Sequence, residues 1–104
     1  MEPHRIRLRD PWDVSPTDDG GTVRRRAFNK PTGLEPGDIV WLVIDDPLEV
    51  TMVAVNESVM FSPPCAVAVD ITSVLRARNV VELRLKPGGS CGEVRLEIEA
   101  VQNN

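Results

Sequence analysis

The second half of the chain alternates apolar and polar residues in the way that half-buried β-strands do. Residues 80–85 and 93–100 follow a period of two, so one face of each segment is apolar. Residues 38–46 are instead apolar at almost every position and rich in β-branched side chains, which predicts a central strand covered on both sides. Together the patterns predict an all-β fold, an antiparallel β-sandwich.

The remaining predicted strands are separated by turn-forming residues. They are residues 5–9, 22–29, 49–55, 58–61 and 66–71, with a loop at 11–21. Asn56 and Glu57 form the turn of a hairpin, because Asn tolerates the positive φ that tight turns need. All nine prolines fall where strands should end, and helix is confined to one turn near Ser73 to Arg76.

The inward-facing positions of these strands define an expected core. It consists of Phe28, Ile39, Trp41, Val43, Val53, Val55, Ile71, Leu75, Leu83, Leu85, Leu96 and Ile98. If the strands at 80–85 and 93–100 pair directly, charge favours the register that sets Glu82 opposite Arg95 and Arg84 opposite Glu93.

Composition and charge narrow the class of protein. The 104 residues are 41% hydrophobic and 27% charged, which is typical of one globular domain spanning residues 1–104. The net charge is −4. Because it divides into a basic first third and an acidic remainder, internal ion pairing is expected rather than nucleic-acid binding. No segment is apolar enough to span a membrane, and the charged start lacks the apolar part of a signal peptide, so a cytoplasmic location is expected.

The cysteines and the histidine offer little chemistry. Cys65 and Cys91 lack the C-x-x-C spacing of a zinc or redox motif, so two unbridged thiols are expected. His4 is the sole histidine and has no nucleophile near it in the sequence. The chain is therefore not expected to be an enzyme.

Four blocks of sequence follow one another in a characteristic order. They are Arg24 to Phe28 (R-R-R-A-F), Pro31 and Gly37 before the apolar run Ile39 to Ile44, Val55-Asn56-Glu57, and Asp70-Ile71-Thr72-Ser73-Val74-Leu75 followed by Asn79 to Leu85. In this order they resemble the N-terminal sugar-binding domain of glycoside hydrolase family 2 enzymes. The resemblance covers about two thirds of the chain. It implies a stand-alone, galactose-binding-domain-like jelly roll of about eight strands.

The same resemblance implies a non-catalytic binding module with carbohydrate as its ligand class. The catalytic carboxylates of those enzymes lie on a separate barrel domain, for which 104 residues leave no room. The chain departs from the family in two ways: Glu57 replaces the turn glycine, and there is no tyrosine, aromatic content being only 4%. The alternative is a protein–protein interaction or structural β-sandwich domain without sugar affinity.

Trp12 is the candidate centre of a sugar site, because it lies in a Pro- and Asp-rich loop where its ring can stack on a pyranose. Asp10 and Asp13 would accept hydrogen bonds from sugar hydroxyls. Arg24 and Arg26 share one face of their strand and would donate them. The alternative is that Trp12 covers the open edge of the sandwich as a lid.

The remaining charged clusters have structural explanations. The arginines at 24–26 are expected to pair with acids such as Asp45, Asp46 or Glu49. Asp18-Asp19 and Asp45-Asp46 resemble calcium ligands, but adjacent carboxylates alone supply too few oxygens. No metal and no cofactor are therefore expected.

Overall fold

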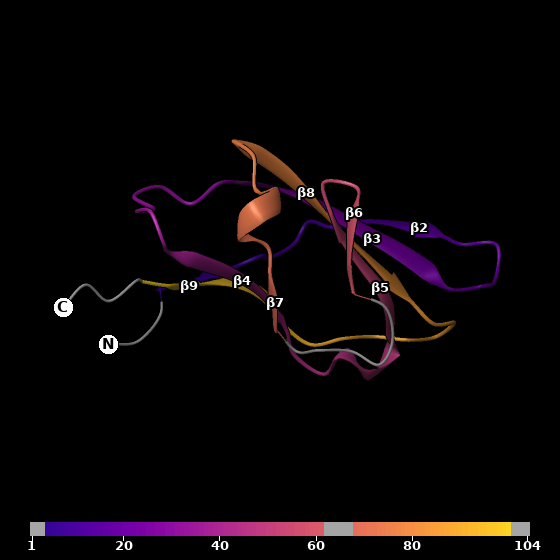
Figure 1. Ribbon diagram of the computed structural model, residues 1–104. Helices are drawn as coiled ribbons and strands as arrows, with labels where there is room; N and C mark the ends of the chain where they lie inside the picture. The colour runs from indigo at the N-terminus through magenta and orange to yellow at the C-terminus, as the bar shows by residue number, and fades with distance from the viewer. Residues whose placement is uncertain (1–3, 62–67, 101–104) are drawn as a thin grey trace.

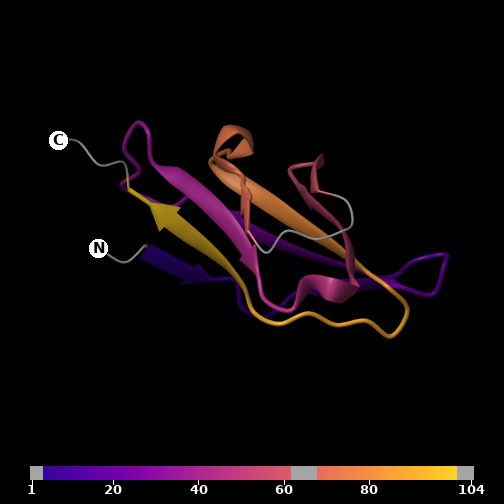
Figure 2. The same ribbon diagram turned by 60° about the horizontal axis from the view of Figure 1, so that its bottom comes forward.

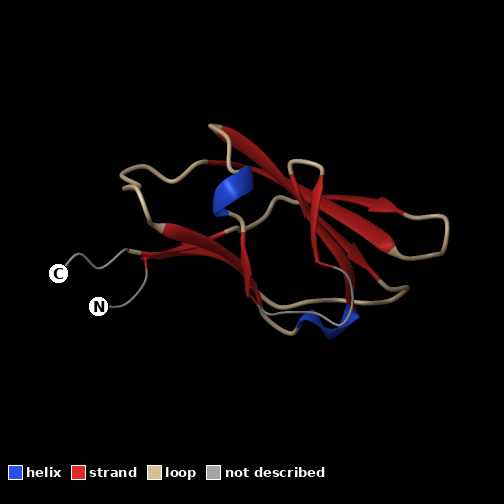
Figure 3. Ribbon diagram, in the orientation of Figure 1, coloured by secondary structure: helices blue, strands red, loops and turns tan. Residues whose placement is uncertain are grey.

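The computed structural model describes residues 4–61 and 68–100, which form β-strands joined by turns (Figures 1 and 3). The strands are β1 (His4–Arg7), β2 (Asp13–Pro16), β3 (Thr22–Asn29), β4 (Ile39–Ile44), β5 (Val50–Val55), β6 (Ser58–Phe61), β7 (Ala68–Asp70), β8 (Arg78–Leu85) and β9 (Val94–Glu99). Two short 3-10 turns, η1 (Pro47–Glu49) and η2 (Thr72–Val74), are the helical segments of these ranges. No helix in them is long and apolar enough to cross a membrane.

The strands form two antiparallel sheets, which confirms the predicted sandwich. One sheet has the order β1-β9-β4-β7 and the other β2-β3-β8-β5-β6. In Figure 2 the first sheet faces the viewer, with β9 between β1 and β4. Among the described strands, only β2–β3 and β5–β6 are consecutive in the sequence and also hydrogen bonded to each other in a sheet. Every other connection crosses from one sheet to the other, as in a jelly roll.

The core lies between the two sheets and follows the alternation of the strands. Leu42 of β4 and Leu83 of β8 are 0% and 1% exposed. Seven of the predicted core residues are buried there: Phe28, Val53, Val55, Ile71, Leu83, Leu85 and Leu96. Val43 is also buried, but it lies outside the core cluster, on the outer face of its sheet. Leu75 and Ile98 are half-buried and pack against this core.

The prediction that Ile39 and Trp41 are core residues is wrong. Val40, Leu42 and Ile44 face inward, so the intervening residues of β4 lie on the outer face of the sheet. Trp41 is half-buried there, and its indole Nε1 donates to a carboxylate oxygen of Glu99 at 3.0 Å. Because every position of β4 is apolar, the period of two could not identify which face is inward.

The strands at 80–85 and 93–100 do not pair directly, so the register considered for that case does not occur. β8 lies between β3 and β5 in one sheet, and β9 lies between β1 and β4 in the other. Glu82 therefore lies opposite Arg25, whose Nε is 2.8 Å from the Glu82 carboxylate. Glu82 of β8 and Glu97 of β9 each lie opposite an arginine of a strand that is distant in sequence.

One local prediction is confirmed, and the others are corrected in part. The hairpin β5–β6 turns at Asn56 and Glu57, both with positive φ. The helical turn lies at Thr72–Val74 rather than Ser73–Arg76, and η1 was not predicted. Part of the loop predicted at 11–21 is strand β2, which pairs with β3. Of the strand predicted at 66–71, residues 66 and 67 lie outside the described ranges.

Asn56, Asn79 and the η2 segment join the two sheets at one end of the sandwich. The Asn79 side chain is 0% exposed and accepts hydrogen bonds from Asn56 Nδ2 and from the amide of Arg76, both at 2.8 Å. Asn56 Nδ2 also donates to the carbonyl of Val74 at 2.9 Å. On the other side, Thr72 Oγ1 accepts from the amide of Val40 at 2.9 Å. These residues, which carry the family resemblance, therefore serve the fold.

Candidate functional site

An open groove of about 610 Å³ runs beside Trp12, where the chain crosses from β1 to β2. We call it the Trp12 groove. Its apolar lining residues are Leu8, Trp12, Val14, Leu83 and Val94. Its polar lining residues are Arg7, Arg9, Asp10, Arg24, Cys91 and Glu93, with Gly92 between the last two. An apolar surface with a few polar groups around it is the general form of a small-ligand site.

Trp12 is held in the groove by the crossing segment that follows β1. The amide of Leu8 donates to the carbonyl of Val94 at 2.9 Å, and the Leu8 side chain is buried in the core. The indole Nε1 of Trp12 donates to the carbonyl of Leu8 at 3.2 Å. The Trp12 ring is half-buried and packs against the core, so it both covers the open edge of the sandwich and lines the groove.

Arg24 enters the groove because β3 alternates its side chains between the two faces of its sheet. It lies opposite Val14 of β2 and Leu83 of β8, both of which also line the groove. Its Nε is buried and makes no hydrogen bond within the described part of the chain. Arg25 points to the opposite face, where it pairs with Glu82.

Cys91 is a free, half-buried thiol in the same groove. Burial raises the pKa of the Cys91 thiol, because the thiolate loses solvation; the positive charge of Arg24 opposes this effect and Asp46 adds to it. The thiol is therefore protonated near neutral pH. Cys65, the other predicted free thiol, lies outside the described ranges.

Of the five predicted site residues, Asp10, Trp12 and Arg24 line the groove together. Asp13 does not, because it lies opposite Arg25 and so shares the outer face of the sheet. Arg26 lines a neighbouring groove, and its Nε donates to the carbonyl of Arg9 at 2.5 Å. Arg26 therefore holds the crossing segment that carries Asp10 and Trp12, rather than facing the Trp12 groove.

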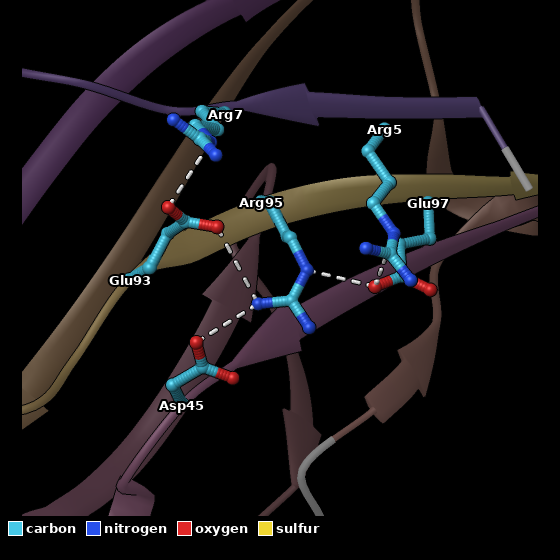
Figure 4. Close-up of polar contacts among 6 residues, drawn as sticks. All are labelled: Arg5, Arg7, Asp45, Glu93, Arg95 and Glu97. Atoms are coloured by element: carbon cyan, nitrogen blue, oxygen red, sulfur yellow. Dashed lines mark hydrogen bonds and ion pairs between the residues drawn. The ribbon is translucent and has the colours of Figure 1, made fainter.

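A second, more polar groove of about 700 Å³ lies on the outer face of the β1-β9-β4-β7 sheet. Its centre is Arg95, which bonds Glu97 at 2.7 Å and Asp45 at 3.0 Å (Figure 4). The hydrogen bonds that Arg95 donates to the carboxylates of Glu97 and Asp45 raise the pKa of its guanidinium. Arg7 completes the row by pairing with Glu93 at 3.2 Å. The charged side chains of this groove other than Arg9 are held in ion pairs, and the groove has no aromatic side chain among its lining residues.

The predicted pairings of the arginine cluster are only partly right. Internal pairing does occur, but the acid that Arg25 contacts is Glu82, not Asp45, Asp46 or Glu49. Asp45 instead pairs with Arg95.

The adjacent acids do not gather into a metal site. Asp19 accepts hydrogen bonds from the Thr17 hydroxyl and from the Gly21 amide, and these lower the pKa of its carboxyl group. In residues 4–61 and 68–100, no three His, Cys, Asp or Glu side chains lie close enough together to hold a metal ion.

Sequence reasoning missed the residues that β1 and β9 bring to the Trp12 groove. The alternation of residues 5–9 does indicate that Arg7 and Arg9 share the exposed face of their strand. No pattern indicates Cys91 or Glu93, because their approach to Trp12 depends on the way that two strands distant in sequence meet.

The comparisons with known proteins bear on the fold alone. No model of a protein family matches the chain, and a search of curated proteins finds no match. Among solved structures, the chain is similar to an FMN-binding beta-glucuronidase from Facaelibacterium prausnitzii L2-6, with a TM-score of 0.72 and 16% sequence identity. The match covers 95% of this chain and 23% of that one, so this chain has the fold of a domain-sized part of a larger glycosidase.

Proposed function

We propose that this chain is a non-catalytic carbohydrate-binding module, related to the sugar-binding domain of glycoside hydrolase family 2, and that it binds sugar in the Trp12 groove. The observation that carries the proposal is the convergence of Asp10 and Trp12, from the segment between β1 and β2, with Arg24 of β3 on one groove. The similarity to a domain-sized part of a β-glucuronidase supports it, because that protein is a glycosidase and this chain spans only 23% of it.

The chemistry of the groove suits a pyranose. A sugar ring has apolar C–H faces and a rim of hydroxyls, so it needs an aromatic or apolar surface with acceptors and donors at its edge. Trp12 supplies the aromatic surface, Asp10 an acceptor and Arg24 a donor. Because the groove is open, single-site affinity is expected near the millimolar range, or about −4 kcal/mol.

The test is a glycan-array screen followed by NMR titration of the 15N-labelled protein. Trp12→Ala should abolish the sugar-dependent shifts, whereas Trp41→Ala should retain them, because Trp41 lies on the outer face of the other sheet. Since Trp12 also packs against the core, Asp10→Asn is the second variant. Asp10 is exposed and its side chain makes no hydrogen bond or ion pair in the described ranges, so this change should weaken binding without unfolding the domain.

The second candidate function is recognition of a protein partner through the outer face of the larger sheet. Val59 and Val80 lie on that face and are 61% and 43% exposed. If no glycan shifts any resonance and Trp12→Ala only lowers the melting temperature, Trp12 is a lid. The carbohydrate proposal is then wrong, and protein recognition becomes the leading function.

A further inference from the structure

Arg24 lines the Trp12 groove. Of the three arginines at 24–26, it alone has a guanidinium that makes no hydrogen bond or ion pair within the described part of the chain. Arg25 pairs with Glu82, and Arg26 donates to backbone carbonyls. Arg24 Nε is buried without an acceptor. A buried donor without an acceptor destabilises the fold, and the guanidinium that lines the groove has no partner to lose when a ligand brings it an acceptor.

The charges around the groove do not balance. Arg7 and Glu93 form an ion pair at 3.2 Å and so neutralise each other. Of the charged residues that remain, Arg9 and Arg24 are positive and Asp10 is negative, and none of the three has an ion-pair partner among the described residues. The groove thus keeps one unbalanced positive charge, next to an aromatic ring.

A neutral pyranose would leave this charge and the Arg24 donor unmatched. A sugar with a carboxylate would match both, because the guanidinium fork of arginine donates two parallel hydrogen bonds to a carboxylate. Arg24 lies directly opposite Val14 and Leu83 on the neighbouring strands, beside the apolar lining of the groove. A ring over Trp12 could therefore direct its carboxylate toward the guanidinium.

We infer that the preferred ligand of the Trp12 groove is a saccharide with a uronic acid residue, whose carboxylate binds Arg24 with support from Arg9. This inference rests on the proposed carbohydrate function and adds the class of sugar. Asp10 has the opposite role, because its carboxylate accepts a hydrogen bond from a ring hydroxyl. No covalent step is involved.

The test compares charged and neutral sugars of the same ring. The 15N-labelled protein is titrated with the sodium salts of glucuronic and galacturonic acid, and with glucose and galactose, at low and high sodium chloride. The uronates should bind about tenfold more tightly at low salt, since a charge-assisted hydrogen bond contributes at least that factor. The difference should narrow as salt screens the interaction.

Two variants on one strand make the test specific. Arg24→Gln should remove the preference for uronates, while Arg25→Gln, a change on the opposite face of β3, should retain it. The NMR spectra of both variants should keep the chemical-shift dispersion of the folded domain. A third variant, Arg9→Gln, should reduce the preference by a smaller factor, because Arg9 only adds to the field around the carboxylate.

The possible failures are distinguishable. If neutral sugars bind at Trp12 as tightly as the uronates, the carbohydrate function stands and the acidic-sugar inference is overturned. If sodium acetate or phosphate produces the same shifts at the same concentrations, the groove binds simple anions and the sugar ring has no part, which overturns the inference. If no sugar and no anion shifts the groove resonances, the proposed function itself fails.

Discussion

Asn56 and Asn79 hydrogen bond to each other at 2.8 Å, and this contact fixes the β5–β6 turn against the beginning of β8. Asn79 is fully buried, and Asn56 has the positive φ that the hairpin turn requires. Each amide makes further hydrogen bonds to the backbone, including one from Asn56 to the η2 segment. The pair therefore joins three segments that hydrophobic packing alone would not align.

Asn79→Ala should destabilise the domain by about 1 to 3 kcal/mol, because it leaves the Arg76 amide and Asn56 Nδ2 without their buried acceptor. Urea unfolding followed by tryptophan fluorescence measures the loss. Asn29→Ala, a change of the same type at an exposed end of β3, should cost much less. Equal losses in the two variants would contradict the role assigned to Asn79.

Leu83→Ala should cost about 2 to 5 kcal/mol, because Leu83 is 1% exposed and its removal leaves a cavity between the two sheets. The matched control is Leu48→Ala, since Leu48 is 86% exposed and should change stability by less than about 0.5 kcal/mol. Thermal unfolding monitored by circular dichroism compares the two. A loss below about 1 kcal/mol for Leu83→Ala would show that this face is not the core.

Arg95→Met should lower the stability by about 1 to 2 kcal/mol, because it removes the hydrogen bonds that the guanidinium donates to Asp45 and Glu97 and leaves both carboxylates without this cation. Arg5→Met should have little effect, since the Arg5 side chain is 60% exposed and 3.7 Å from Glu97. The difference between the two melting temperatures should shrink in high salt. A larger effect for Arg5 than for Arg95 would refute this ranking.

Cys91 should react with iodoacetamide only at a pH above that needed for a free thiol, because burial raises the pKa of its thiol. The rate is measured against pH in the Cys65→Ser variant, with the urea-unfolded protein as the control. The raised pKa also makes the free energy of unfolding depend on pH. The full stability is present below the pKa of the unfolded thiol, and it falls as pH rises through the higher pKa of the folded one.

The same reaction reports on the Trp12 groove, since Cys91 lines it. A bound sugar should slow the alkylation of Cys91 in the Cys65→Ser protein at constant pH. Unchanged kinetics at a saturating sugar concentration would place the ligand elsewhere on the domain.

The sequence by itself determined the class of fold and most of the strands. Period-two segments such as β8 have one apolar face, and packing that face against a second layer removes it from water. The chain has strand patterns and almost no helical ones, so the second layer is another sheet. The turn at Asn56 was also predictable, because few residues accept a positive φ. Local conformational preference and the apolar pattern are properties of the chain alone.

Only the tertiary structure decided which strands are neighbours, which face of β4 is inward and which residues meet at the Trp12 groove. β4 is apolar on both faces, so its orientation follows from Leu42 lying opposite Leu96 in the inner layer. Asp10 and Asp13 are three residues apart, yet only Asp10 faces the groove with Arg24, because β2 begins at Asp13 and turns it to the other side. Contacts between segments distant in sequence depend on the pairing of all the strands together, and no local pattern encodes that pairing.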